Sequence, residues 1–115
     1  DMDENSNWQK NFPGAITITD KDGIIKFMNE KASQVFKDDG GYSLIGTNVF
    51  DCHPEPSKSK LKDLYEKKTL NSYTIEKNGI KKLIYQSPLF ENDKFNGYVE
   101  LSLEIAFDMP HFIRG

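Results

Sequence analysis

Apolar and polar residues alternate along the first third of the chain in a way that predicts a β-hairpin followed by a short helix. Residues 15–19 alternate with a period of two and are rich in β-branched side chains, which is typical of a strand. Asp22-Gly23 favours the positive φ angles of a tight turn, so residues 24–28 are predicted to form the return strand. Asn29 is then placed to cap a helix, whose apolar stripe consists of Ala32, Val35 and Phe36.

The middle of the chain predicts a second, longer helix after an irregular stretch. Residues 38–41 are acidic and glycine-rich and end the first helix, and residues 44–52 show no regular period. Two prolines then oppose helix formation until Ser57, which we predict to be an N-cap. The helix over 58–68 carries its apolar stripe on Leu61, Leu64 and Tyr65.

The remainder of the chain predicts three consecutive strands. Residues 73–77 and 80–90 flank Asn78-Gly79, a strong two-residue hairpin signal, and a polar turn leads into a strand from 95 to 107. Two strands, a helical interlude and a three-strand meander predict an α+β domain, with a five-stranded antiparallel sheet and short helices on one face.

The two ends of the chain are predicted to lie outside this domain. Residues 1–12 form an N-terminal arm or cap helix in which Trp8 and Phe12, four positions apart, share one face. The domain itself spans 13–107, and residues 108–115 form a C-terminal tail. Met2 follows a single Asp1, which fits either a nearly complete protein or a domain cut from a larger one.

Composition narrows the possible partners. The chain has 115 residues, with 15 Lys plus Arg against 18 Asp plus Glu, and the net charge of −3 argues against binding to nucleic acid or to an anionic membrane. No apolar run approaches the ~20 residues that span a bilayer. The single cysteine, Cys52, excludes an internal disulfide and fits a reducing, cytoplasmic location. No catalytic motif stands out, so we do not expect an enzyme.

Several segments together resemble the PAS sensor domains. These are ITDKDGII at 18–25, MNEKA at 28–32, LIGTN at 44–48, SPLF at 87–90, and Gly97 with residues 104–105. The resemblance covers residues 13–107. A narrower likeness, carried by residues 52–54 and 97–100, is to the PAS modules attached to bacterial hemerythrin-like domains. The resemblance implies a sensory or signalling module that binds a small ligand or cofactor between sheet and helices. It also implies a homodimer and a signalling effector as partners.

The last strand can face the helices in two ways. Val99, Leu101 and Leu103 form one row of side chains, and Tyr98, Glu100 and Ser102 form the other. Hydrophobic patterning alone puts the apolar row in the core. The resemblance, anchored on Gly97 and Glu104, implies the reverse, and we favour this second arrangement. The apolar row would then be free to pair with another subunit or to be covered by the arm. The predicted interface residues are Trp8, Phe12, Val99, Leu101 and Leu103.

In the second arrangement Glu100 becomes a carboxylate in a mostly apolar cavity, where it must find hydrogen-bond donors or take up a proton. His53 is a candidate partner, and the pair could bind a small polar ligand or sense pH. The alternative is that Glu100 is a solvated sheet residue and His53 only structures the turn before residues 54–56. The predicted ligand-binding residues are His53, Glu100, Ser102, Gln86, Phe50 and Tyr98.

The identity of any cofactor stays open. Haem is possible through His53, although this histidine precedes the long helix rather than lying on it. Flavin is disfavoured because no reactive-cysteine helix motif is present. Cys52, His53 and Glu100 are metal-ligand types without a signature spacing, so we predict no metal site. The alternative function is a ligand-free PAS module that acts through dimerisation or protein interaction.

Overall fold

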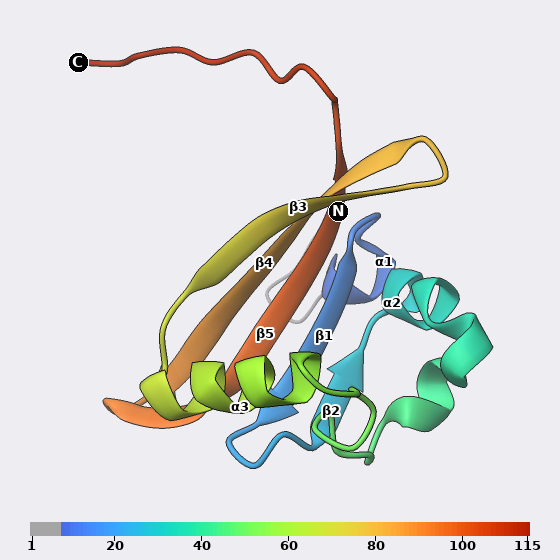
Figure 1. Cartoon of the computed structure of the whole chain (residues 1–115), viewed down its shortest axis with the longest axis vertical. Helices are drawn as coiled ribbons and strands as arrows, with labels where there is room; N and C mark the ends of the chain where they lie inside the picture. Colours follow the sequence, from blue (N-terminus) through green and yellow to red (C-terminus); the bar gives the residue numbers. More distant parts are fainter. Residues whose placement is uncertain (1–7) are drawn as a thin grey trace.

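The structure is a computed structural model that describes residues 8–115, and it places the two longer helices against one side of an antiparallel sheet (Figure 1). The strands follow the order β2-β1-β5-β4-β3 across the sheet. They are β1 (Ala15–Asp20), β2 (Ile25–Met28), β3 (Asn71–Lys77), β4 (Ile80–Glu91) and β5 (Lys94–Ile105). The helices are α1 (Trp8–Asn11), α2 (Glu30–Val35) and α3 (Ser57–Lys67), with 3-10 turns η1 (Lys37–Asp39) and η2 (Gly41–Leu44). The predicted α+β class and five-stranded sheet are confirmed.

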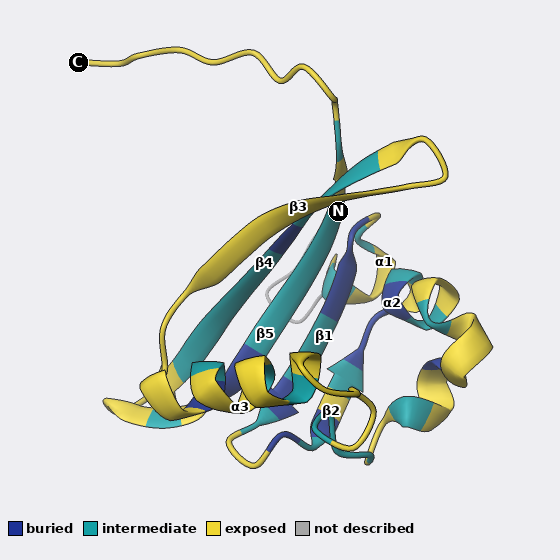
Figure 2. Cartoon of the chain, viewed as in Figure 1, coloured by how far each residue is buried: buried dark blue, intermediate teal, exposed yellow. Residues whose placement is uncertain are grey.

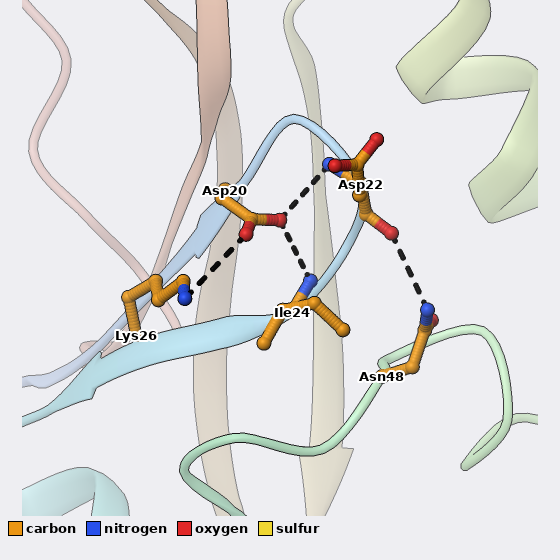
Figure 3. A network of polar contacts seen from close by, with 5 residues as sticks. All are labelled: Asp20, Asp22, Ile24, Lys26 and Asn48. Atoms are coloured by element: carbon orange, nitrogen blue, oxygen red, sulfur yellow. Dashed lines mark hydrogen bonds and ion pairs between the residues drawn. The ribbon is translucent and has the colours of Figure 1, made fainter.

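The turn between β1 and β2 is held by one carboxylate (Figure 3). Oδ1 of Asp20 accepts hydrogen bonds from the backbone N–H groups of Asp22, at 2.9 Å, and Ile24, at 3.0 Å. Its other oxygen lies 3.7 Å from Nζ of Lys26. Asn48 reaches the same turn from a distant segment, because its Nδ2 donates to the Asp22 carbonyl at 3.3 Å. The turn is therefore fixed both locally and by the segment that precedes α3.

Asn29 caps α2, as predicted, and also ties the N-terminal segment to the sheet. Its side-chain oxygen accepts from the N–H groups of Ala32 and Ile16, each at 2.9 Å. Its Nδ2 donates to the carbonyls of Gln9 and Gly14, each at 2.8 Å. The residue is only 1% exposed, so these bonds satisfy a polar group that water does not reach. Beside it lies the apolar cluster of Ala15, Ile25, Met28 and Ala32.

The N-cap predicted for the long helix is wrong. Ser57 is the first residue within α3 and Pro56 is the cap, without a side-chain hydrogen bond. The capping contact comes instead from Glu55, whose carboxylate accepts from the N–H of Ser59 at 2.9 Å and from its hydroxyl at 2.8 Å. A carboxylate near a helix N-terminus is electrostatically favourable, which is why Glu55 can replace a serine cap.

The side chains of β5 adopt the second of the two arrangements considered above. The hydroxyl of Tyr98 lies 2.6 Å from the carbonyl oxygen of Leu64 in α3, so Tyr98 faces the helices. Strand alternation places Glu100 and Ser102 on the same side. Val99, Leu101 and Leu103 lie on the opposite side, which we call the outer face. The arrangement derived from hydrophobic patterning alone is wrong, because the polar row carries the tyrosine that packs under α3.

The two edges of the sheet differ in how they are covered. β2 is tied to the segment before α3, since the N–H of Ile25 donates to the Thr47 carbonyl at 2.9 Å and the N–H of Gly46 donates back to Ile25 at 2.8 Å. Within residues 8–115, β3 pairs only with β4. Every residue of β3 is exposed, as its yellow ribbon shows (Figure 2).

The ends of the chain extend from this body. α1 is one turn long and ends at Asn11, so Phe12 lies just beyond it, and residues 1–7 of the predicted arm lie outside the described residues. Residues 106–115 have no regular structure and project away from the end of β5 (Figure 1). None of the helices described for residues 8–115 has the length and apolar character needed to cross a membrane.

Candidate functional site

A chain of polar side chains crosses the helix-facing side of the sheet from β3 to β5. Nδ2 of Asn71 donates to Oε1 of Gln86 at 2.9 Å, and Nε2 of Gln86 donates to Oε2 of Glu100 at 2.8 Å. The three residues lie on adjacent strands and directly opposite one another in register. Because each amide donates towards β5, the chain ends on a hydrogen-bond acceptor, the Glu100 carboxylate. We call this set the polar chain.

Further polar groups flank Glu100. Thr17 lies directly opposite it on β1, and Ser102 lies two residues along β5 on the same side. All three side chains are half-buried. Ile84, opposite Ser102, is buried and supplies an apolar floor between the polar groups. The arrangement offers a carboxylate and two hydroxyls on a surface partly shielded from water.

The negative charge of Glu100 contributes to the raised pKa values of two tyrosines, Tyr65 and Tyr73. Partial burial of its ring raises the pKa of Tyr73, and the nearby Glu100 carboxylate raises it further. Burial is also the main cause that raises the pKa of Tyr65 to about 12, with Glu100 adding to it and the hydrogen bond with Thr19 opposing it. Both pKa values rise because burial disfavours the tyrosinate anion, and a carboxylate nearby disfavours it further.

An aromatic cluster holds α3 over one end of this surface. Tyr65 of α3 packs against Tyr98 at 4.4 Å between ring centroids and against Phe50 at 5.0 Å. Its hydroxyl is hydrogen-bonded to that of Thr19, and Phe95 packs edge-on at 6.2 Å. Phe50 and Tyr98 were predicted to bind a ligand. In the structure they pack against Tyr65 and hold α3 on the sheet.

A shallow groove lies on the far side of Tyr65, between α3 and the β1–β2 turn. Its volume is about 640 Å³. Three aromatic side chains line it, with lysines and acidic residues at the rim: Phe50, Tyr65, Phe95, Lys21, Lys62, Lys68, Asp22 and Glu66. Lys62 and Lys68 lie over the rings of Phe50 and Phe95, at 5.9 and 5.4 Å from the centroids. The lysines therefore already have partners within the protein.

The predicted pairing of His53 with Glu100 is not seen. His53 is exposed on the loop before α3, and its Nδ1 lies 2.6 Å from the carbonyl oxygen of Val49. This contact matches the alternative in which the histidine structures the turn. Cys52 is exposed beside it, and within residues 8–115 no three His, Cys, Asp or Glu residues come together as a metal site would require.

The residues predicted as an interface lie on or beside the outer face. Val99, Leu101 and Leu103 are half-buried there. Gly14 lies between Leu103 and Phe12, so closely that a Cβ atom would be 2.4 Å from Cδ2 of Leu103 and 2.8 Å from the Phe12 ring. Trp8 packs edge-on against Phe12 at 5.6 Å. The arm thus reaches the outer face at Leu103, and the role of these residues in dimerisation stays a prediction.

Sequence reasoning missed three members of the site: Asn71, Tyr73 and Thr17. The positions of Asn71 and Tyr73 could be read from the sequence, because a two-residue hairpin loop fixes the register of the two strands that it joins. Counting back from Lys77 and Ile80, which flank Asn78-Gly79, places Asn71 opposite Gln86, as observed. No comparable turn joins β1 to β5, so Thr17 could not be placed beside Glu100 in this way.

Comparison with known proteins identifies the fold. No family model matches the chain, and no curated protein is significantly similar in sequence. Solved structures do match. A C-terminal domain from Streptococcus mutans has a TM-score of 0.71 and 23% identity, over 84% of this chain and 79% of that one. The PAS domain of the histidine kinase ThkA has a TM-score of 0.63 and 22% identity, over 78% and 97%.

A third similar structure is that of the Aer2 receptor from Vibrio cholerae, which its description calls a dual PAS-haem oxygen sensor. It matches with a TM-score of 0.61 and 12% identity, over 81% of this chain and 95% of that one. The order and pairing of the five strands, the helices on one side and these likenesses agree with the resemblance found in the sequence. The chain therefore has the PAS fold.

Proposed function

We propose that this chain is a sensory or signalling module that binds a small polar ligand on the helix-facing side of its sheet. The ligand would donate hydrogen bonds to Glu100 and contact the hydroxyls of Ser102 and Thr17. An amine, an ammonium group or a polyol has the required donors. The module would pass the change on through contacts with a second copy or with an effector protein.

The observation that carries this proposal is the direction of the polar chain. Asn71 and Gln86 point their amide hydrogens towards Glu100, so only one of the two carboxylate oxygens is used within the described residues. A half-buried carboxylate gains most from a donor that completes its hydrogen bonding. A ligand donor at the second oxygen would do so without breaking the existing bonds.

The same residues suggest how binding could be communicated. Asn71 is the first residue of β3, and Tyr98, two residues before Glu100, supports α3. A ligand that binds one position of these elements better than another shifts their equilibrium by that difference in affinity. β3 and α3 are therefore the elements expected to respond.

Haem is not part of this proposal. A haem-binding histidine has to direct a ring nitrogen into an apolar pocket. His53 lies instead on an exposed loop, bonded to Val49, and the groove nearest to it is lined at its rim by charged side chains. The donor set on the sheet, a carboxylate with amides and hydroxyls, suits a hydrogen-bonding ligand better than a porphyrin.

Native mass spectrometry of the freshly purified protein tests the proposal, with an absorbance spectrum of the same sample. We expect an adduct on the wild type that disappears on denaturation and is absent from Glu100→Gln. Glu104→Gln is the matched control, because Glu104 lies on the same side of the same strand but is exposed. An apo mass for freshly prepared wild type, or equal adducts on both variants, would contradict the proposal. A Soret band would identify haem and refute the ligand class proposed here.

A second candidate function is a ligand-free module that dimerises through the outer face. The supporting observation is the apolar row of Val99, Leu101 and Leu103, because α2 and α3 both pack on the other side of the sheet. Leu101→Glu would place a charge in the middle of that row. If the outer face is a dimer interface, this variant should be a folded monomer. A folded dimer would refute this candidate.

A further inference from the structure

Among residues 8–115, the free edge of the sheet lacks most of the features that usually prevent strands from pairing between molecules, and its only charged residues, Glu76 and Lys77, lie at one end of β3. Exposed edge strands are commonly short, bulged, interrupted by proline or covered. β2 is short and tied to Gly46 and Thr47, as described above. β3 has seven residues, contains no proline and pairs with β4 without a register shift. Its central residues, Tyr73, Thr74 and Ile75, are strand formers.

The backbone groups that point outward from β3 follow from the hairpin. Asn78 and Gly79 both have positive φ angles, 54° and 77°, so Lys77 and Ile80 close a two-residue turn. Such a turn closes on a pair whose backbones are hydrogen-bonded to each other, and the pattern then alternates along the strand. Ser72, Thr74 and Glu76 therefore direct their N–H and C=O groups away from β4.

These three residues can pair with the same residues of a second copy. If two β3 strands meet antiparallel about a two-fold axis at Thr74, Thr74 faces Thr74, and Ser72 faces Glu76 twice. All three are then hydrogen-bonded pairs, as the outward groups require. On the helix-facing side, Tyr73 meets Ile75, an aromatic and β-branched pair that stabilises sheets.

The charges favour the same register. Lys77 meets Asn71 and Glu76 meets Ser72, so no like charges lie opposite each other. Moving one strand by four residues, so that Glu76 meets Glu76, would place two carboxylates side by side. The two-fold register about Thr74 uses every outward backbone group without this repulsion.

We infer that β3 pairs with β3 of a second copy, joining two sheets into a continuous ten-stranded sheet. The two-fold axis runs perpendicular to the sheet, so the helices of both copies lie on the same side. This goes beyond the proposed ligand site, and it does not involve the outer face. It also places Asn71, the start of the polar chain, within the interface opposite Lys77.

Charge complementation at Thr74 tests this inference. Thr74→Lys and Thr74→Asp each place two like charges opposite each other at the axis, and we expect each to weaken dimerisation about fivefold or more. An equal mixture of the two variants should recover the wild-type dimer, since Lys then faces Asp. Sedimentation equilibrium of the full chain measures all three samples against the monomer mass of 13.2 kDa. Thr74→Val is the control, and we expect it to dimerise as the wild type does.

Thr74→Pro tests the backbone hydrogen bonds between the two β3 strands. Proline removes the outward N–H but not a bond to β4, so the fold should remain. Two intermolecular hydrogen bonds are lost per dimer, and we expect association to weaken about tenfold or more.

A monomeric wild type, or no recovery on mixing the charged variants, would overturn the inference. So would a dimer that is lost in Leu101→Glu but kept in Thr74→Pro. The ligand proposal is tested separately, by the adduct in the native mass spectrum. A negative result for β3 pairing would therefore leave the proposed ligand binding unaffected.

Discussion

The hydroxyl of Tyr98 in β5 lies 2.6 Å from the carbonyl oxygen of Leu64 in α3, and 2.9 Å from that of Thr69 just after the helix. One strand residue thus holds the end of the helix that crosses the sheet. Tyr65 adds the second attachment, through its ring contact with Tyr98 and its hydrogen bond to Thr19. The position of α3 over the sheet depends on these two tyrosines.

Replacing Tyr98 with Phe should loosen this end of α3. The ring contacts stay, but two carbonyls lose a donor, and we expect the free energy of unfolding to fall by about 1–2 kcal/mol. Tyr85→Phe is the control, because Tyr85 lies on the outer face of β4, away from α3. Urea unfolding measures both. Equal stability of the two variants would show that the hydroxyl does not hold the helix.

Asn29→Asp should be more damaging, although it changes a single atom. The new carboxylate still accepts from Ile16 and Ala32 but cannot donate to Gln9 and Gly14. A buried charge would then face two carbonyl oxygens, and we expect a loss of about 3 kcal/mol or more at neutral pH. Part of this loss should be recovered at acidic pH, where the carboxyl can donate again.

The same change at Asn48 is the matched control. Asn48 also uses its oxygen as an acceptor, from Phe50, and its Nδ2 as a donor, to Asp22. Its donor bond is solvent-exposed, so Asn48→Asp should cost less than about 1 kcal/mol. Thermal unfolding of both variants at two pH values makes the comparison, and a similar loss in both would contradict the role of Asn29.

These contacts show what the sequence could and could not predict. The hairpins, the N-cap at Asn29 and the register of β3 against β4 follow from local patterns and turn residues. The face of β5 did not follow from hydrophobicity, because its helix-facing row contains Tyr98 and Glu100 rather than Leu101 and Leu103. What decides that face is the packing of α3, whose Tyr65 lies far from β5 in sequence.

The site itself was only partly accessible from the sequence. Gln86 and Glu100 could be proposed together because both belonged to strands of the expected meander. The sequence also makes His53 a candidate partner of Glu100. In the structure a local contact to Val49 holds it on the loop instead. Loop positions depend on such backbone contacts, which residue patterns do not specify.

Gly97→Ala should destabilise the sheet strongly. Gly97 has a φ of 140°, and an added Cβ would lie 2.0 Å from the backbone oxygen of Thr19. The β1–β5 pair would have to separate, and we expect a loss of about 3 kcal/mol or more. Gly46→Ala is the control. Its φ is 93°, but nothing lies within 4 Å of the added atom, so we expect only about 1–2 kcal/mol. Denaturant unfolding that ranked the two alike would contradict the close approach.

Stability should fall in alkaline solution through Tyr65. Burial is the main cause that raises its pKa to about 12, against the usual 10.0. The folded protein therefore holds this proton more tightly than the unfolded chain. The contribution is fully present below pH 10 and is lost as the pH rises towards 12, by up to about 2 kcal/mol. Tyr65→Phe removes the titrating group, so its stability should fall less over the same range. Parallel slopes for the two proteins would show that Tyr65 titrates normally.

Removing the charge of Glu100 should lower the pKa values of Tyr65 and Tyr73. Burial is the main cause of both raised values, and the Glu100 carboxylate adds to each. In Glu100→Gln the tyrosinate anions would no longer face that charge, so both groups should titrate at lower pH than in the wild type. Tyrosinate absorbance during an alkaline titration measures the change. Glu104→Gln, on the same side of β5, should leave the titration unchanged, because Glu104 is exposed and lies near Lys31. An identical curve for all three proteins would mean that Glu100 carries no charge near these tyrosines. The site would then lack the anionic acceptor on which the proposed ligand class depends.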